Sequence, residues 1–160
     1  MKIILAILLA FLLTGCANLR NVEVMSSLRA SAHSAVGADA ILTAGGIMLG
    51  AGTEVNPLVT DIKSGVALVG LRLAAVEIAN RQPEPQRTTA LAVSNAVTWG
   101  VVSNNLYVIA AKLFAFLPAG PTPIIVGLTS GWIIWDATEE QRQLATMCAL
   151  MKETHPNTRC

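Results

Sequence analysis

The sequence predicts an all-α protein with two helical hairpins, about four helices that form a small membrane bundle, and an amphipathic helix at the C-terminus. Apolar residues make up 53% of the 160 positions and charged residues only 13%, about half the charged share of a soluble domain. Two uncharged runs, 88–111 and 113–135, each exceed the roughly 18 residues that mark a candidate membrane span. A Pro-Ala-Gly-Pro turn at 118–121 indicates that the second run begins with a reversal of the chain.

The N-terminus has the features of a signal peptide at 1–15. Lys2 supplies a positive charge, and positions 3–13 form an apolar stretch too short for a comfortable membrane span. The Leu-Thr-Gly-Cys motif that ends at Cys16 resembles the lipobox of bacterial lipoproteins. The resemblance implies that Cys16 is lipidated and that the protein is anchored in a membrane of the bacterial cell envelope, inner or outer. An uncleaved anchor helix with a buried Cys16 is the alternative.

Composition shifts divide the rest of the chain into segments. We expect a lipidated tether at 16–35, hairpin one at 36–80, transmembrane hairpin two at 88–136, and an amphipathic tail at 137–160. The expected helices span about 36–54, 59–80, 88–117 and 121–136. The tether also allows a short surface helix, because Met25, Leu28 and Ala32 recur at helical spacing. The uncharged stretches of hairpin one are short enough to fit a soluble bundle as well.

Hairpin one carries two opposite charges at matched distances from its turn. Asp39 lies 17 positions before Asn56, and Arg72 lies 16 positions after it. At 1.5 Å per helical residue both are roughly 25 Å from the turn. The spacing therefore predicts an intramembrane ion pair between Asp39 and Arg72, with Glu77 as a competing partner.

The same stretch resembles a class of small integral membrane proteins of bacteria and phages. The shared pattern is an Asp-x-x-x-Thr motif, a Glu-x-Asn-Pro-Leu turn, and a basic residue in the next helix. In this chain the pattern falls on Asp39, Thr43, Glu54, Asn56, Pro57, Leu58 and Arg72. The resemblance implies a helical membrane hairpin and no known activity. Structural roles for these residues, such as capping and helix register, are the other interpretation.

Small residues and cysteines give further expectations. Two Gly-x-x-x-Gly patterns allow close helix contact, either within the chain or between copies. They consist of Gly46 with Gly50, and Gly127 with Gly131. An Asp-x-x-Glu pattern at 136–139 predicts a capping box that starts the tail helix. In an oxidising compartment Cys148 and Cys160 could form a disulfide, although Cys148 could equally be a packed thiol.

The function predicted from these features is non-enzymatic. No phosphate-binding loop, paired CxxC or HExxH motif is present in the sequence, so we expect no catalytic residue, metal or cofactor. The net charge of +1 argues against a nucleic-acid partner. We expect a membrane lipoprotein with an interaction or structural role, and a phage-encoded protein is one setting for such a role. Its expected partners are membrane lipid and either another envelope protein or a second copy of the chain. A small transport or pore component that uses intramembrane polar residues is the alternative.

Overall fold

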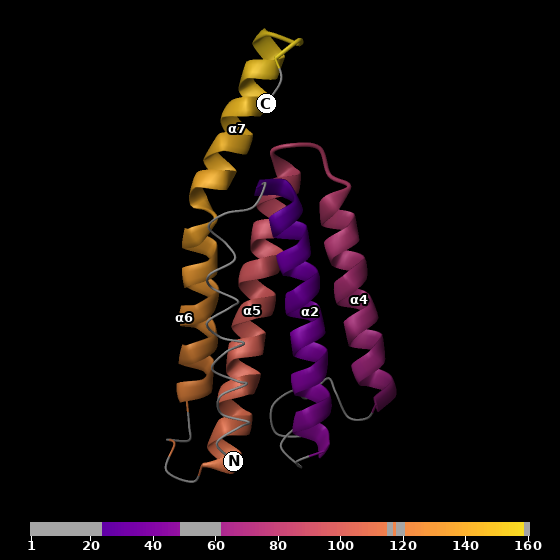
Figure 1. The fold of residues 1–160 in the computed structure, drawn as a ribbon, viewed down its shortest axis with the longest axis vertical. Helices are drawn as coiled ribbons and strands as arrows, with labels where there is room; N and C mark the ends of the chain where they lie inside the picture. The colour runs from indigo at the N-terminus through magenta and orange to yellow at the C-terminus, as the bar shows by residue number, and fades with distance from the viewer. Residues whose placement is uncertain (1–23, 49–61, 115–116, 118–120, 159–160) are drawn as a thin grey trace.

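The computed structural model describes residues 24–48, 62–114, 117 and 121–158. These residues form five α-helices without any strand, which confirms the predicted all-α class. The helices are α2 (Val24–Met48), α4 (Ile62–Asn80), α5 (Gln86–Leu113), α6 (Thr122–Ala137) and α7 (Glu139–Thr154). Figure 1 shows α6, α5, α2 and α4 side by side, with α7 extending past one end of this bundle.

Side-chain contacts fix the relative directions of the helices. Asn95 of α5 donates to the carbonyl oxygen of Leu28 in α2, and further along both helices Trp99 donates to Ser31. Since both members of these pairs advance together, α2 and α5 run parallel. Helix α4 runs antiparallel to α2, and α6 runs antiparallel to α5 (Figure 1). Figure 1 shows α4 and α6 at the two edges of the bundle.

The main core lies where α2, α4 and α5 meet. It consists of Leu28, Ala32, Val36, Val76, Ala79 and Leu91, with Val69 and Ala90 packed against it. Three of these residues, Leu28, Ala32 and Val36, follow one another at intervals of four and so form one helical face. Small alanines in this set allow the helices to approach closely while large side chains fill the remaining space.

Helix α2 begins earlier than the sequence predicts. Residues 24–35 were expected in the tether, yet they form the first turns of α2, and the side chains of Leu28, Ala32 and Ala35 are fully buried. The polar residues among them, such as Arg29, Ser31 and His33, lower the average hydropathy of the segment without removing its apolar face. Helix α2 is the first helix of hairpin one, and α4 is the second.

Helices α5 and α6 approach each other closely through glycines. A Cβ atom added to Gly100 would lie 2.8 Å from the carbonyl oxygen of Gly127, and one added to Gly131 would lie 2.9 Å from that of Ala96. Distances below 3.0 Å leave no room for a side chain. The predicted contact face of Gly127 and Gly131 is therefore occupied by α5 of the same chain.

The other two glycines of the predicted patterns are placed differently. Gly46 is buried within α2, and Gly50 lies outside the described residues. The predicted signal peptide at 1–15, Cys16, and the predicted turn residues Glu54, Asn56 and Pro57 also lie outside the described residues.

A short elbow at Thr138 joins α6 to α7. Helix α6 continues through Asp136 to Ala137, so the predicted capping box at 136–139 is wrong. Thr138 occupies the N-cap of α7 without a side-chain cap, and its hydroxyl donates instead to the carbonyl oxygen of Trp135, 2.8 Å away. Arg142 stacks 3.5 Å from the ring centroid of Trp135 and donates to the same carbonyl oxygen. These contacts brace α7 against the end of α6.

Helices α5 and α6 correspond to hairpin two, which the sequence predicts to span a membrane. Among the described residues, no helix combines enough length with enough apolar character for a membrane crossing of its own.

Candidate functional site

The most unusual interior feature of the bundle is a buried ion pair. Arg72 of α4 donates through Nη1 to Oδ2 of Asp39 on α2. This is the ion pair that the equal distances of the two residues from the predicted turn indicated. The Asp39 side chain is only 4% exposed, whereas that of Arg72 is 22% exposed. Helix α4 brings Arg72 to the bundle edge, from which its long side chain reaches inward. The pair leaves no net charge inside the bundle.

Two asparagines of α5 extend this pair across the bundle. Nδ2 of the buried Asn105 donates to Oδ1 of Asp39 at 2.9 Å, and Asn104 donates to Asn105 at 3.3 Å. Asn104 also lies against α6, since its Cβ is 3.1 Å from the position that a Cβ of Gly127 would take. We call Arg72, Asp39, Asn105 and Asn104 the polar chain. It links α4, α2 and α5 and ends beside α6.

The polar chain satisfies a buried carboxylate on both of its oxygens. Arg72 contacts Oδ2 and Asn105 contacts Oδ1, so Asp39 is held from α4 and from α5 at once. A buried carboxylate needs such partners, because desolvation of an isolated charge is expensive. Sequence spacing predicted Arg72 as a partner of Asp39, but it did not identify Asn105 as the second one.

A second, exposed ion cluster joins α2 to α4 near the other end of these helices. Arg29 donates to Oε1 of Glu77 at 2.7 Å, and Nε2 of His33 lies 3.3 Å from the same oxygen. Sequence spacing had made Glu77 a competing partner for Arg72, yet the structure pairs it with Arg29. The hydrogen bond from Arg29 is the main reason that the pKa of Glu77 lies below its usual value.

The lowered pKa of Glu77 predicts a contribution to stability that depends on pH. A carboxyl group whose folded pKa is depressed stabilises the fold above its unfolded pKa, here 4.5, and this contribution disappears as pH falls through the folded pKa. We expect wild type to melt at a higher temperature than Glu77→Gln between about pH 5 and 7, and the two to converge toward about pH 3. Thermal unfolding followed by circular dichroism measures the difference.

A matched control for this experiment is Glu140→Gln on α7. Glu140 is exposed and distant in sequence from the cluster, so its removal should leave the pH profile of the wild type unchanged. An equal gap between wild type and Glu77→Gln at pH 3 and pH 7 would contradict the assigned role of the Glu77 carboxylate.

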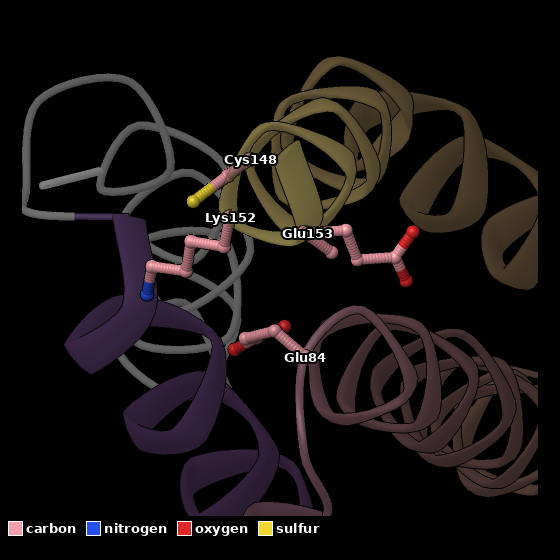
Figure 2. A pocket seen from close by; sticks show the side chains of 5 residues that line it. Glu84, Cys148, Lys152 and Glu153 are labelled. Carbon is pink, nitrogen blue, oxygen red and sulfur yellow. The ribbon is translucent and has the colours of Figure 1, made fainter. Parts of the chain in front are cut away.

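A shallow cleft lies between α7 and the turn that joins α4 to α5. It is lined by Glu84, Cys148, Ala149, Lys152 and Glu153, and Figure 2 shows the side chain of Glu84 facing those of α7. Glu84 also serves α5, because its Oε2 accepts hydrogen bonds from the backbone N–H and the hydroxyl of Thr88. Cys148 is disulfide-bonded, whereas Cys160 lies outside the described residues.

The described residues do not bring metal-binding side chains together. No three His, Cys, Asp or Glu side chains among them could hold a metal ion. In the polar chain an arginine and an amide hold one buried carboxylate.

Comparison with known proteins adds no relative. No protein-family model matches the sequence, and no curated protein or solved structure is significantly similar to it.

Proposed function

We propose that this chain is a non-enzymatic membrane lipoprotein of the bacterial cell envelope, with an interaction or structural role. In this proposal a lipid on Cys16 anchors the chain, and the helical bundle sits among the acyl chains of the same membrane. Membrane lipid is then the first partner, and another envelope protein is the second. The proposal combines the lipobox-like motif that ends at Cys16 with the surface composition of the bundle.

The observation that carries the proposal is the apolar surface of the two edge helices. On α4 the exposed large apolar side chains are Val66, Leu71, Leu73 and Ile78, and on α6 they are Ile124, Ile125, Leu128, Trp132 and Ile133. We call these nine side chains the apolar belt. Leu71 is 68% exposed and Leu128 is 71% exposed. Soluble monomers rarely expose apolar side chains so continuously, whereas a helix in lipid turns such residues outward.

The charges of the bundle support the same proposal. Arg72 is the one charged residue of positions 64–76 on α4, and positions 122–135 on α6 have none. Arg72 is turned inward to Asp39, so its charge is neutralised inside the bundle, and Glu77, beside Ile78 at one end of the belt, is paired with Arg29. Ionisable residues in a membrane usually face the bundle interior and pair with one another.

The direction of the polar chain favours a structural role over transport. Its members come in turn from α4, α2 and α5, so the chain runs across the bundle rather than along its length. A path for ions would need polar groups at successive depths along the helices. A buried polar layer at one depth instead fixes which helices pair and in which register. The arrangement suits a rigid scaffold that presents its surface to a partner.

Lipidation of Cys16 gives the direct test of the anchor. We expect radiolabelled palmitate to enter the protein in bacterial cells, and Cys16→Ser to abolish this labelling. Cys148→Ser is the matched control, because it replaces the disulfide-bonded cysteine of α7 and leaves the lipobox-like motif intact. Equal labelling of Cys16→Ser and wild type would reject the lipid anchor.

A further inference from the structure

We propose that one face of α7 is the docking site for a basic amphipathic helix of another envelope protein. The inference rests on the proposed function and deepens it, because it names the chemistry of the protein partner. Three features of α7 support it: the side on which its large apolar residues lie, the charges beside them, and the position of the helix beyond the end of the bundle.

The amphipathic pattern of α7 is turned away from the protein's own bundle. The partly buried residues of the helix are small or polar, namely Gln141, Arg142, Ala145, Cys148 and Ala149. The large apolar residues are between 48% and 57% exposed, and we call them the outer face: Leu144, Met147, Leu150 and Met151. With Cys148 they line a shallow, wholly apolar hollow. Since an amphipathic helix normally buries its apolar side, the outer face is a surface that the described part of the chain leaves open.

The charges beside the outer face are acidic. Glu140 lies four residues before Leu144 and so on the same side of the helix, and Glu139 precedes it in the first turn. The basic residues of α7 lie elsewhere. Arg142 stacks against the end of α6, and Lys152 lines the cleft between α7 and the turn that joins α4 to α5 (Figure 2). A partner helix that covers the outer face therefore needs lysines or arginines beside Glu139 and Glu140.

The position of α7 favours protein over lipid as the occupant. Figure 1 shows α7 extending past the end of the bundle. At 1.5 Å per residue, Leu144 and Met151 lie about 12 Å and about 22 Å beyond Asp136, the first charged residue after α6's uncharged run. The headgroup region adds only about 5–8 Å to each side of the hydrocarbon core. In the proposed membrane location the outer face therefore lies beyond the reach of the acyl chains.

A second copy of the chain suits the outer face less well than a basic helix does. Copies anchored in one membrane point the same way, so two paired α7 helices would be parallel and each Glu140 would lie beside its counterpart. Like charges placed together across an interface are unfavourable, whereas lysines of a basic helix attract the same carboxylates. The outer face covers about two helical turns, which suits a small interface and a transient complex.

Peptide binding to the full lipidated protein in nanodiscs tests the proposal. The nanodiscs consist of phosphatidylcholine, which carries no net charge, and empty nanodiscs measure binding to lipid alone. The probe is a fluorescent amphipathic peptide with leucines on one face and lysines beside them, and a comparison peptide has glutamate in place of every lysine. We expect the protein to bind the basic peptide about tenfold or more tightly than the acidic one. Equal affinities, or no binding beyond that of empty nanodiscs, overturn the proposal.

Two pairs of variants locate the bound peptide on α7. Leu150→Ser should weaken binding of the basic peptide about fivefold or more, whereas Ile41→Ser, which removes an exposed side chain from α2, should leave it unchanged. Glu140→Lys should shift the preference toward the acidic peptide, whereas Glu153→Lys, on the side of the cleft, should shift it much less. A gain of affinity for the acidic peptide cannot result from misfolding. Equal effects within either pair overturn the assignment of the outer face.

Two further measurements separate this inference from the proposed function and from self-association. Flotation with phosphatidylcholine vesicles tests the membrane location alone. Co-flotation without peptide binding rejects the docking site and keeps the location, and peptide binding without co-flotation does the reverse. Analytical ultracentrifugation in detergent tests for a dimer, and a dimer that Leu150→Ser dissociates would assign the outer face to a second copy and overturn the inference.

Discussion

Replacing Gly100 by alanine should lower the free energy of unfolding by about 1–3 kcal/mol, a typical cost of overpacking. The added methyl group would lie 2.8 Å from the carbonyl oxygen of Gly127, and backbone atoms cannot rotate away as a flexible side chain can. Helices α5 and α6 would have to separate, which would also loosen the contact between Gly131 and Ala96. Urea unfolding of the purified protein in detergent micelles measures the loss.

Gly70→Ala is the matched control for this substitution. Gly70 lies in the middle of α4, and a Cβ atom added there would meet no heavy atom within 4 Å. Because alanine favours a helix more than glycine does, we expect this variant to be more stable by up to about 1 kcal/mol. If Gly100→Ala were as stable as Gly70→Ala, the close approach of α5 and α6 would be refuted.

Replacing Asp39 by alanine should have the largest effect of any single substitution in the bundle. It leaves the Arg72 guanidinium without its partner and deprives Asn105 of its acceptor. Removing one member of a buried ion pair typically costs about 3–5 kcal/mol, because the remaining charge stays desolvated. Arg72→Ala should be similarly harmful. The double variant Asp39→Leu with Arg72→Leu should recover much of the loss, since it replaces two charges with apolar side chains.

Arg29→Ala serves as the comparison for an exposed ion pair. Its partner Glu77 is solvated, and exposed pairs contribute little to stability. We expect a much smaller change in the urea midpoint than for Asp39→Ala. If Asp39→Leu with Arg72→Leu were no more stable than Asp39→Ala or Arg72→Ala, the destabilisation would not come from a stranded charge.

The helices and the Asp39–Arg72 contact could be predicted from the sequence because both follow from local geometry. A constant rise per residue places two positions equally far from a turn at the same depth of an antiparallel hairpin. The extent of α2 could not be predicted from polarity alone. Its buried face consists partly of Ala32 and Ala35, and alanines give a weak hydropathy signal even where they are fully buried.

The contacts between the two hairpins depend on information that spacing within one segment does not contain. The choice of Asn105 over Asn95 as the partner of Asp39 depends on how α5 is placed along α2, which is set by contacts such as that of Asn95 with Leu28. The Gly127 and Gly131 pattern was visible, but its partner surface was not. That surface is formed by Gly100 and Ala96, which do not stand out among the many small residues of the chain.

The double use of Asp39 makes the two hairpins thermodynamically interdependent. One carboxylate oxygen is bound by hairpin one, through Arg72, and the other by hairpin two, through Asn105. Separation of the two hairpins would leave Asp39 in hairpin one without its Asn105 donor and Asn105 in hairpin two without its acceptor, so partly unfolded states are penalised relative to the complete bundle. We therefore expect α2, α4, α5 and α6 to unfold as one cooperative unit, and neither hairpin to stay folded once it is separated from the other.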